Sequence, residues 1–224
     1  MSYDIAFSTD FKRNPYKGKL IALEGIDGSG KTTQAHKIVD ILNKKDIRAV
    51  FTKEPTDKIT GKLIREFLSG KMKFSPVAFQ YLFAADRAVH QEEIEPQLKK
   101  GLTLISDRYF WSSVVYGTID KKIDFSDVLS NFDHILVAHS ILSMYHQFLV
   151  PDMTFYLRVS VPTSLARLRE KDIHSEIYEK KSNLEKLAKG YDWLAKKFPK
   201  EITVVNGEGS LEEVTERMIS RINK

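Results

Sequence analysis

The sequence contains no cysteine and no long apolar run, and each absence excludes a class of protein. Without cysteine among its 224 residues, the chain can form neither disulfide bonds nor thiolate metal sites. No apolar stretch approaches the roughly 20 residues that a membrane-spanning helix needs. Residues 1–18 also lack the apolar core of a secretory signal. We therefore expect a cytoplasmic protein with no membrane partner.

The charge is moderately basic, and a concentrated basic segment is missing. The formal net charge is +5, but lysine and arginine are scattered along the chain instead of forming one block. A dispersed excess of this size favours small anionic ligands over a polynucleotide, because no nucleic-acid reader motif accompanies it. We therefore expect no polynucleotide partner.

Short apolar segments alternate with amphipathic ones along most of the chain. The pattern predicts strands at 19–24, 47–52, 102–106, 153–159 and 202–205. It predicts helices at 31–44, 60–68, 76–100, 162–169, 176–197 and 211–223, with Pro96 bending or ending the third of these. Alternating strands and helices indicate an α/β fold with a parallel five-stranded sheet between helical layers.

Neither repeats nor low-complexity linkers divide the chain. We therefore expect a single domain over residues 19–224, preceded by an extension over residues 1–18 whose aromatic side chains pack on it. Residues 118–150 contain apolar positions at helical spacing but no pattern that indicates chemistry.

A glycine-rich loop joins the first predicted strand to the first predicted helix. Residues 25–32 read Gly-Ile-Asp-Gly-Ser-Gly-Lys-Thr, and this spacing lets backbone N–H groups surround phosphate oxygens at a helix N-terminus. Lys31 would reach the β- and γ-phosphates, and the Thr32 hydroxyl would bind Mg²⁺. The strand before it and the helix after it distinguish a three-layer P-loop NTPase fold from a plain glycine turn. The predicted ATP site consists of Gly25, Ile26, Asp27, Gly28, Ser29, Gly30, Lys31, Thr32 and Thr33.

Asp107 ends the third predicted strand. Ligands bind at the carboxyl ends of strands in open α/β sheets, so Asp107 is expected beside the phosphate loop as a second Mg²⁺ residue with Thr32. Taken alone, an aspartate in this place could equally cap a turn.

A GTPase interpretation has one apparent support, the sequence Asn43-Lys44-Lys45-Asp46. This stretch matches a guanine-reading motif, but it follows the first helix, where it cannot reach a base. We therefore reject a GTPase switch.

Charged and aromatic residues in later segments favour a kinase for a small acceptor. Transfer between two nucleotides gathers phosphate charge from both, and arginine forks bind phosphate oxygens in pairs. The segments are Glu54-Pro55-Thr56, Leu82-Phe83-Ala84-Ala85-Asp86-Arg87, Asp107-Arg108-Tyr109, Glu176-Ile177-Tyr178-Glu179 and the cations Arg167, Arg169 and Lys171.

Together with the phosphate loop, these segments resemble the thymidylate kinase family in order and approximate spacing. The resemblance covers roughly residues 19–117 and 151–223. It implies that Phe83 stacks on thymine, that Arg87 bonds the edge of the base, and that Arg108 holds the acceptor 5′-phosphate. It further implies a catalytic role for Lys31 and Asp107.

The resemblance extends the acceptor site to several further side chains. It places Asp27 and Tyr178 at the deoxyribose, and it places Glu54, Ser112, Tyr116 and Gly117 in the same pocket. Without the resemblance, Phe83 would be taken as a core residue, and Arg87 as a solvated residue or a partner of Asp86 or Glu92. Because Gly117 has no side chain, the residue that reads the base there is left open.

Residues 167–178 correspond to the lid of the family, which closes over ATP and excludes water. Some members carry a catalytic arginine inside the phosphate loop, where this chain has Gly28. The cation is therefore expected from the lid, with Arg167, Arg169 and Lys171 as candidates and Arg169 preferred. Two further departures from the family are Lys53 and Arg158.

Three histidines, His134, His139 and His146, lie close together in the sequence. Their spacing does not match a zinc site, so we interpret them as ordinary histidines.

The resemblance implies transfer of a phosphoryl group from ATP to dTMP, with Mg²⁺ as cofactor, by a homodimer. The alternatives are a kinase for another monophosphate such as dUMP, CMP or UMP, and a P-loop ATPase or nucleotide-binding regulator.

Overall fold

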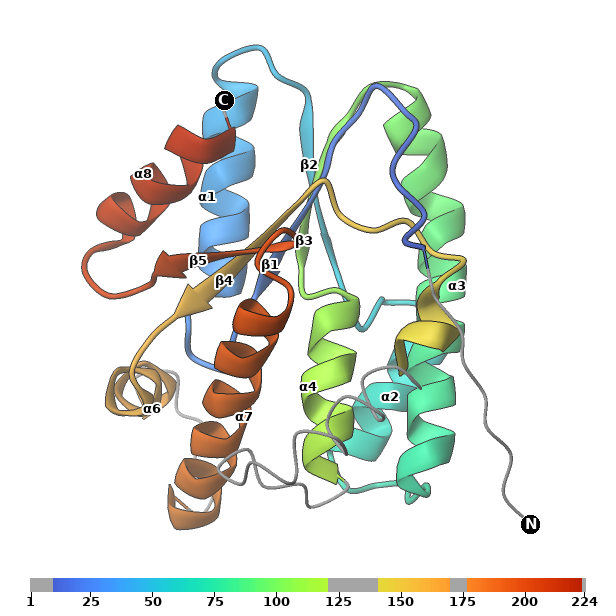
Figure 1. The fold of residues 1–224 in the computed structure, drawn as a ribbon, viewed down its shortest axis with the longest axis vertical. Coiled ribbons are helices and arrows are strands. Elements are labelled where there is room, and N and C mark those ends of the chain that lie inside the picture. Colours follow the sequence, from blue (N-terminus) through green and yellow to red (C-terminus); the bar gives the residue numbers. More distant parts are fainter. Residues whose placement is uncertain (1–9, 121–140, 170–176, 223–224) are drawn as a thin grey trace.

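A parallel five-stranded sheet forms the centre of the molecule (Figure 1). The computed structural model describes residues 10–120, 141–169 and 177–222. The strands are β1 (Leu20–Glu24), β2 (Ala49–Lys53), β3 (Thr103–Asp107), β4 (Met153–Arg158) and β5 (Ile202–Asn206). Their order is β2-β3-β1-β4-β5. All the pairings are parallel, as the alternating sequence pattern predicted.

Helices cover both faces of the sheet. On one face lie α1 (Lys31–Asn43) and α8 (Leu211–Ile222), and on the other lie α3 (Pro76–Lys99), α4 (Phe110–Asp120) and α7 (Ile177–Lys197) (Figure 1). The shorter α2 (Ile59–Leu68) packs on α3, and α6 (Val161–Arg169) follows β4. Among the described helices, none combines the length and the apolar character that crossing a membrane requires.

The alternation of side chains in β1 divides the core in two. Leu20 and Ala22 are fully buried under α3, α4 and α7, whereas Ile21 and Leu23 are fully buried under α1 and α8. Successive residues of a strand point to opposite faces, so a strand that is apolar throughout fits only a sheet covered on both sides. The three-layer arrangement follows from this pattern.

For the strands and helices that the sequence predicted, the described bounds agree with the prediction within about two residues. Pro96 lies inside α3, which ends three residues later at Lys99. The helix that the sequence did not predict is α4, which follows β3 directly. Buried side chains of α4 include Phe110, Trp111, Val114 and Val115. The helix therefore has no single apolar stripe facing a polar one.

The described part of the amino-terminal extension packs on the domain as expected. Phe11 lies against Phe110 and Trp111, with ring centroids 6.1 and 6.0 Å apart. The Tyr16 hydroxyl donates a hydrogen bond to Glu95. The expected packing of Tyr3 and Phe7 falls outside the described residues.

Because the sheet is parallel, the loops that follow β1, β3, β4 and β5 all leave the same edge. They contain the phosphate loop, Arg108, the start of α6 and the stretch 207–210. Residues from these loops line one cavity.

Candidate active site

The phosphate loop has the backbone shape that its glycines predict. Gly28 and Gly30 have φ values of 75° and 96°, in the left-handed region that glycine adopts without strain. Gly28 also lies under α6, where a β-carbon would come within 2.5 Å of the Ser164 carbonyl oxygen. The Ser164 hydroxyl donates to the Asp27 carbonyl at 2.5 Å and holds the two segments together. An arginine could not replace Gly28 in this packing.

Lys31 begins α1 and points back into the loop. Its Nζ donates to the Ile26 carbonyl at 2.8 Å, and the residue is 6% exposed. Burial, with a contribution from the nearby charge of Arg108, lowers the pKa of Lys31 to about 8. The lysine is thus a concentrated and poorly solvated charge at the place where phosphates would bind.

Thr32 and Asp107 meet across the loop, as the sequence predicted for a metal pair. The Thr32 hydroxyl donates to Asp107 Oδ2, while Asp107 Oδ1 is buried and accepts no hydrogen bond from any residue that the structure describes. A hydroxyl and a carboxylate with a free oxygen are the hard oxygen ligands that Mg²⁺ prefers, and substrate phosphates usually complete its shell. The pair therefore fits Mg²⁺. In the described ranges, no group of three histidine, aspartate or glutamate side chains forms another candidate metal site.

A cavity of about 580 Å³ surrounds these residues. This volume lies within the range of small-molecule sites, about 300–1,000 Å³. Its walls come from the phosphate loop, the end of β3, α6 and the start of α8, and they include Asp27, Gly28, Ser29, Gly30, Lys31, Thr32, Thr33, Asp107, Arg108, Arg167, Leu168, Gly209 and Ser210.

Arg108 has an unusual backbone conformation, with φ at 69°. This conformation turns the guanidinium back toward the phosphate loop, where Nη2 lies 2.5 Å from Asp27 Oδ1. Nη1 donates to Ser112 Oγ at 3.1 Å and to the Gly25 carbonyl at 3.3 Å. A strained non-glycine backbone that is held by several hydrogen bonds is typical of functional positions.

Glu24, which hydrogen-bonds to the residues around Arg108, was not predicted from the sequence. Glu24 ends β1, is 1% exposed and accepts backbone hydrogen bonds from Tyr109 and Ser112. Its other oxygen accepts the hydroxyls of Ser112 and Tyr191 at 2.5 and 3.2 Å. Burial raises the pKa of Glu24. An acidic residue at the end of an apolar strand was the signal for Glu24, whereas no sequence pattern marked Tyr191.

A second buried network joins β2 to α3. Glu54 accepts two hydrogen bonds from Arg87 and lies 2.9 Å from His90 Nδ1. Burial alone would raise the pKa of Glu54, but the charge of Arg87 and the contact with His90 outweigh it and leave this pKa below its ordinary value. Beside it, Asp86 accepts the Thr56 hydroxyl at 2.6 Å and the Thr60 hydroxyl at 2.7 Å.

Sequence comparison relates this geometry to known proteins. The profile of the family described as thymidylate kinase matches residues 23–218. The chain belongs to the thymidylate kinase family. It is therefore an enzyme, a nucleoside monophosphate kinase, and the phosphorylation of dTMP with ATP as donor is the activity of this family.

Individual relatives agree with the family match. A protein named "Probable thymidylate kinase" in Methanocaldococcus jannaschii is 38% identical over 200 residues, covering 89% of this chain and 93% of its own. One of the same name in Thermococcus onnurineus is 35% identical over 213 residues, covering 91% and 96%. A "Thymidylate kinase" of Brachyspira hyodysenteriae is 35% identical over 175 residues, covering 77% and 79%.

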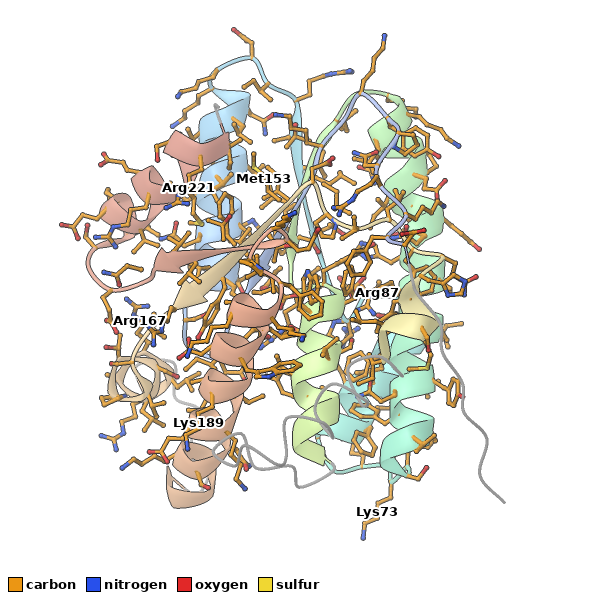
Figure 2. The ribbon with its side chains drawn as sticks, in the orientation of Figure 1. Lys73, Arg87, Met153, Arg167, Lys189 and Arg221 are labelled. Atoms are coloured by element: carbon orange, nitrogen blue, oxygen red, sulfur yellow. The ribbon has the colours of Figure 1, made fainter. Side chains whose placement is uncertain are left out.

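The residues that the thymidylate kinase resemblance assigned to the base lie between α3 and α4. Phe83 is half-buried, with its ring edge-on to Phe79 at a centroid distance of 4.7 Å. Arg87 lies between α3 and α4 (Figure 2). It is 1% exposed, and its Nη2 lies 3.3 Å from Ser113 Oγ on α4. Tyr116 lies under Arg108, with the guanidinium 5.4 Å from its ring centroid, and burial raises the pKa of Tyr116 to about 12.

The structure places the two arginines of the predicted lid differently. Arg167 donates to the Ser29 carbonyl at 3.3 Å and to the Gly207 carbonyl at 3.2 Å, and it lines the cavity. Arg169, the candidate that the sequence favoured, is exposed at the end of α6 and does not line it. Lys171 and the side chain of Tyr178 fall outside the described residues.

Other sequence features have ordinary structural explanations. Asn43 of the rejected guanine motif ends α1, and its side chain exchanges hydrogen bonds with the backbone of Ala49. His146 Nδ1 lies 2.6 Å from the Ser143 carbonyl, and His134 and His139 fall outside the described residues. Lys53 and Arg158 form ion pairs with Asp57 and Asp192 at the surface.

Proposed function

We propose that this chain transfers the γ-phosphoryl group of ATP to the 5′-phosphate of dTMP, giving ADP and dTDP, with Mg²⁺ as cofactor. The observation that carries the proposal is the meeting of Lys31, the Thr32–Asp107 pair and Arg108 at one edge of the sheet. These residues supply phosphate-binding cations and a metal-binding pair for two anionic reactants side by side.

The donor side consists of the phosphate loop and α6. Backbone N–H groups of the loop and the N-terminus of α1 would bind the β- and γ-phosphates, and Lys31 would neutralise them. Thr32 and Asp107 would hold Mg²⁺, which supplies charge neutralisation on the phosphates. Among the lid cations we now favour Arg167, because it already lies against the Ser29 carbonyl.

The acceptor side consists of Arg108 and the pocket between α3 and α4. Arg108 would bind the 5′-phosphate of dTMP and direct one of its oxygens in line with the γ-phosphate. That oxygen is already anionic at neutral pH, so the reaction needs no strong general base. Phe83 and Arg87 would bind the base, and Asp27 would accept the 3′-hydroxyl of the deoxyribose.

Glu54 has a different part in this scheme. It is 7% exposed and saturated by Arg87 and His90, so it would orient Arg87 instead of contacting the nucleotide. Ser112 would similarly orient Arg108, to which it is hydrogen-bonded.

We also propose a cytoplasmic homodimer, as the family resemblance implies. Val77 and Tyr81, one turn apart on α3, are 57% and 62% exposed, and this apolar helix face supports an interface along α3. Light scattering should give the mass of two chains, and a mass of one chain would contradict the dimer.

The test of the reaction is ADP release from ATP and Mg²⁺ with each nucleoside monophosphate supplied separately. Strong stimulation by dTMP over a control without acceptor supports the proposal. Stimulation by a different monophosphate would retain a kinase and overturn the thymine assignment. Equal release with and without acceptors would indicate an ATPase.

A further inference from the structure

The strongest unexplained feature outside the phosphate site is the side chain of Gln80. Gln80 is 9% exposed, and among the described residues neither its Nε2 nor its Oε1 has a hydrogen-bond partner. Burying an amide without a partner costs free energy, and native structures contain few such groups. An amide left in this state is explained if a ligand supplies its partners.

Two other buried polar atoms that have no partner in the described part of the chain lie in the same part of the molecule. They are Arg87 Nη1 and the hydroxyl of Tyr145. The Arg87 guanidinium lies 4.4 Å from the centre of the Tyr145 ring, so these two groups are neighbours. The remaining polar atoms of Arg87 are bound to Glu54 and Ser113, which leaves Nη1 of a fixed guanidinium available as a donor.

The spacing in α3 places Gln80, Phe83 and Arg87 on one side of the helix. Residues three, four and seven apart share a face of an α-helix. Phe83 is half-buried between the two polar residues. A base stacked on Phe83 would therefore lie beside both the guanidinium of Arg87 and the carboxamide of Gln80.

Gly117 explains how Gln80 reaches this position. A β-carbon at Gly117 on α4 would lie 2.8 Å from Gln80 Nε2, and it would also collide with the side chain of Ile141. The absence of a side chain at 117 thus makes room for the carboxamide of Gln80. A residue from α3 takes the space that a side chain of α4 would otherwise fill.

We propose that Gln80 is a specificity-determining residue that reads the imide edge of the acceptor base. Thymine presents two carbonyl oxygens on either side of an N3–H donor. The Arg87 N–H would donate to one carbonyl, Gln80 Oε1 would accept the N3–H, and Gln80 Nε2 would donate to the other carbonyl. This assignment rests on the proposed acceptor, dTMP, and adds the side chain that selects it.

The same pair of residues would disfavour cytosine. Cytosine places an amino group where thymine has O4, and its N3 carries no proton. The amino group would face the guanidinium of Arg87, which has only donors. Gln80 Oε1 would face the unprotonated N3, and turning the amide so that Nε2 donates to N3 would set Oε1 against the O2 of cytosine, so neither side chain fits this base fully. Uracil has the same imide edge as thymine, so Gln80 accepts dUMP and dTMP alike.

The decisive experiment compares Gln80→Met with the wild-type enzyme, using dTMP, dUMP and dCMP as acceptors. Methionine keeps the length of the side chain and removes both hydrogen-bonding groups. We expect kcat/KM for dTMP and dUMP to fall by about 10-fold, mainly through KM, because two buried hydrogen bonds to the base are lost. The value for dCMP and the KM for ATP should change less than about twofold. The ratio of kcat/KM for dTMP to kcat/KM for dCMP should therefore fall in the variant.

Gln97→Met is the matched control. Gln97 lies on the same helix, and its amide donates to the Glu93 carbonyl at the surface, so kcat/KM for all three acceptors should keep its wild-type value.

Thermal melting adds a readout that separates a loss of base binding from a loss of stability. Because no residue in the described ranges hydrogen-bonds the Gln80 amide, Gln80→Met should leave the Tm unchanged or raise it.

Two results would overturn the inference. One is a kcat/KM for dTMP within twofold of the wild type, and the other is an equal fall for dCMP. A wild-type enzyme that dTMP does not stimulate would instead refute the proposed function itself.

If the variant does not fold, N3-methyl-dTMP tests the wild type directly. In competition with dTMP, the affinity of the wild type for N3-methyl-dTMP should be at least about 10-fold lower than its affinity for dTMP. Equal affinities would contradict a role for the N3–H.

Discussion

Arg108 Nη2 lies 2.5 Å from Asp27 Oδ1, and this ion pair connects the loop after β3 with the phosphate loop. Asp27 is half-exposed, so the pair adds little to stability. The ion pair instead fixes the position of Arg108. The cation assigned to the acceptor phosphate is thereby held by the loop that would bind the donor phosphates. The Asp27–Arg108 contact therefore joins the donor side of the site to the acceptor side.

Replacing Asp27 with asparagine tests the role of this carboxylate. We expect Asp27→Asn to change the free energy of unfolding by less than about 1 kcal/mol. The kcat/KM for dTMP should fall by about 10-fold, because the 3′-hydroxyl loses a charged acceptor. The wild type should prefer dTMP to its 3′-deoxy analogue, and the variant should lose most of that preference. An undiminished preference in the variant would contradict the assignment of Asp27 to the sugar.

The lowered pKa of Lys31 predicts proton uptake when ATP binds. Free Lys31 has a pKa of about 8, and phosphates beside it favour the protonated form and raise this pKa. Between the two values, binding takes up a proton, so the affinity for ATP falls as pH rises above about 8. Calorimetry at about pH 9, in two buffers of different ionisation enthalpy, measures the uptake directly.

The control for this experiment is Lys31→Met. The variant should bind ATP more weakly and take up no proton at the same pH. Wild-type binding that is independent of buffer at about pH 9 would show that Lys31 does not face the phosphates.

Asp107→Asn should weaken the metal site without disturbing the fold. Asparagine keeps the shape and one oxygen but removes the charge that attracts Mg²⁺. We expect kcat to fall by about 100-fold and the Mg²⁺ concentration for half-maximal rate to rise. ATP binding measured without Mg²⁺ should be unchanged or stronger.

Asp40→Asn provides a matched change, since Asp40 is exposed on α1. It should leave the Mg²⁺ dependence as it is in the wild type. An Asp107→Asn enzyme with the wild-type Mg²⁺ dependence would exclude Asp107 from the metal site.

The buried pair of Glu54 and Arg87 should contribute strongly to stability. Glu54→Gln leaves Arg87 as a buried charge without its counterion, which costs about 3–5 kcal/mol of unfolding free energy. The folded-state pKa of Glu54 lies below its ordinary value of 4.5. The contribution of Glu54 is therefore fully present above about pH 4.5 and is lost as pH falls through the folded-state value.

Urea unfolding of wild type and variant as a function of pH measures this difference. For comparison, Glu93→Gln removes the exposed ion pair with Lys58 and should cost less than about 1 kcal/mol. Equal effects of the two substitutions would contradict the weight given to the buried pair.

The parts of the structure that the sequence predicted well are those fixed by local pattern. The apolar run from Leu20 to Leu23 fits only a doubly covered strand, and the glycines of the phosphate loop fit only a loop with positive φ. The helix α4 was missed because it is buried on nearly every side and has no polar face with a helical period. Burial of that kind depends on neighbours distant in the chain.

The site shows the same division. The phosphate loop and Asp107 lie where the sequence placed them, because each is tied to the end of a strand. The pairing of Arg87 with Glu54 joins residues 33 positions apart, and local sequence pointed instead to nearby acidic partners. The choice between Arg167 and Arg169 depends on the direction in which α6 leaves the sheet, which a charge pattern does not contain.

The most direct test of the whole account is the transfer of label from [γ-³²P]ATP to dTMP by the wild type, Arg108→Ala and Arg158→Ala. Arg158 also ends a strand of the sheet but pairs with Asp192 at the surface. The account predicts labelled dTDP from the wild type and from Arg158→Ala. Arg108→Ala should lose at least about 100-fold in kcat/KM for dTMP while keeping its affinity for ATP. Full activity of Arg108→Ala would contradict the account.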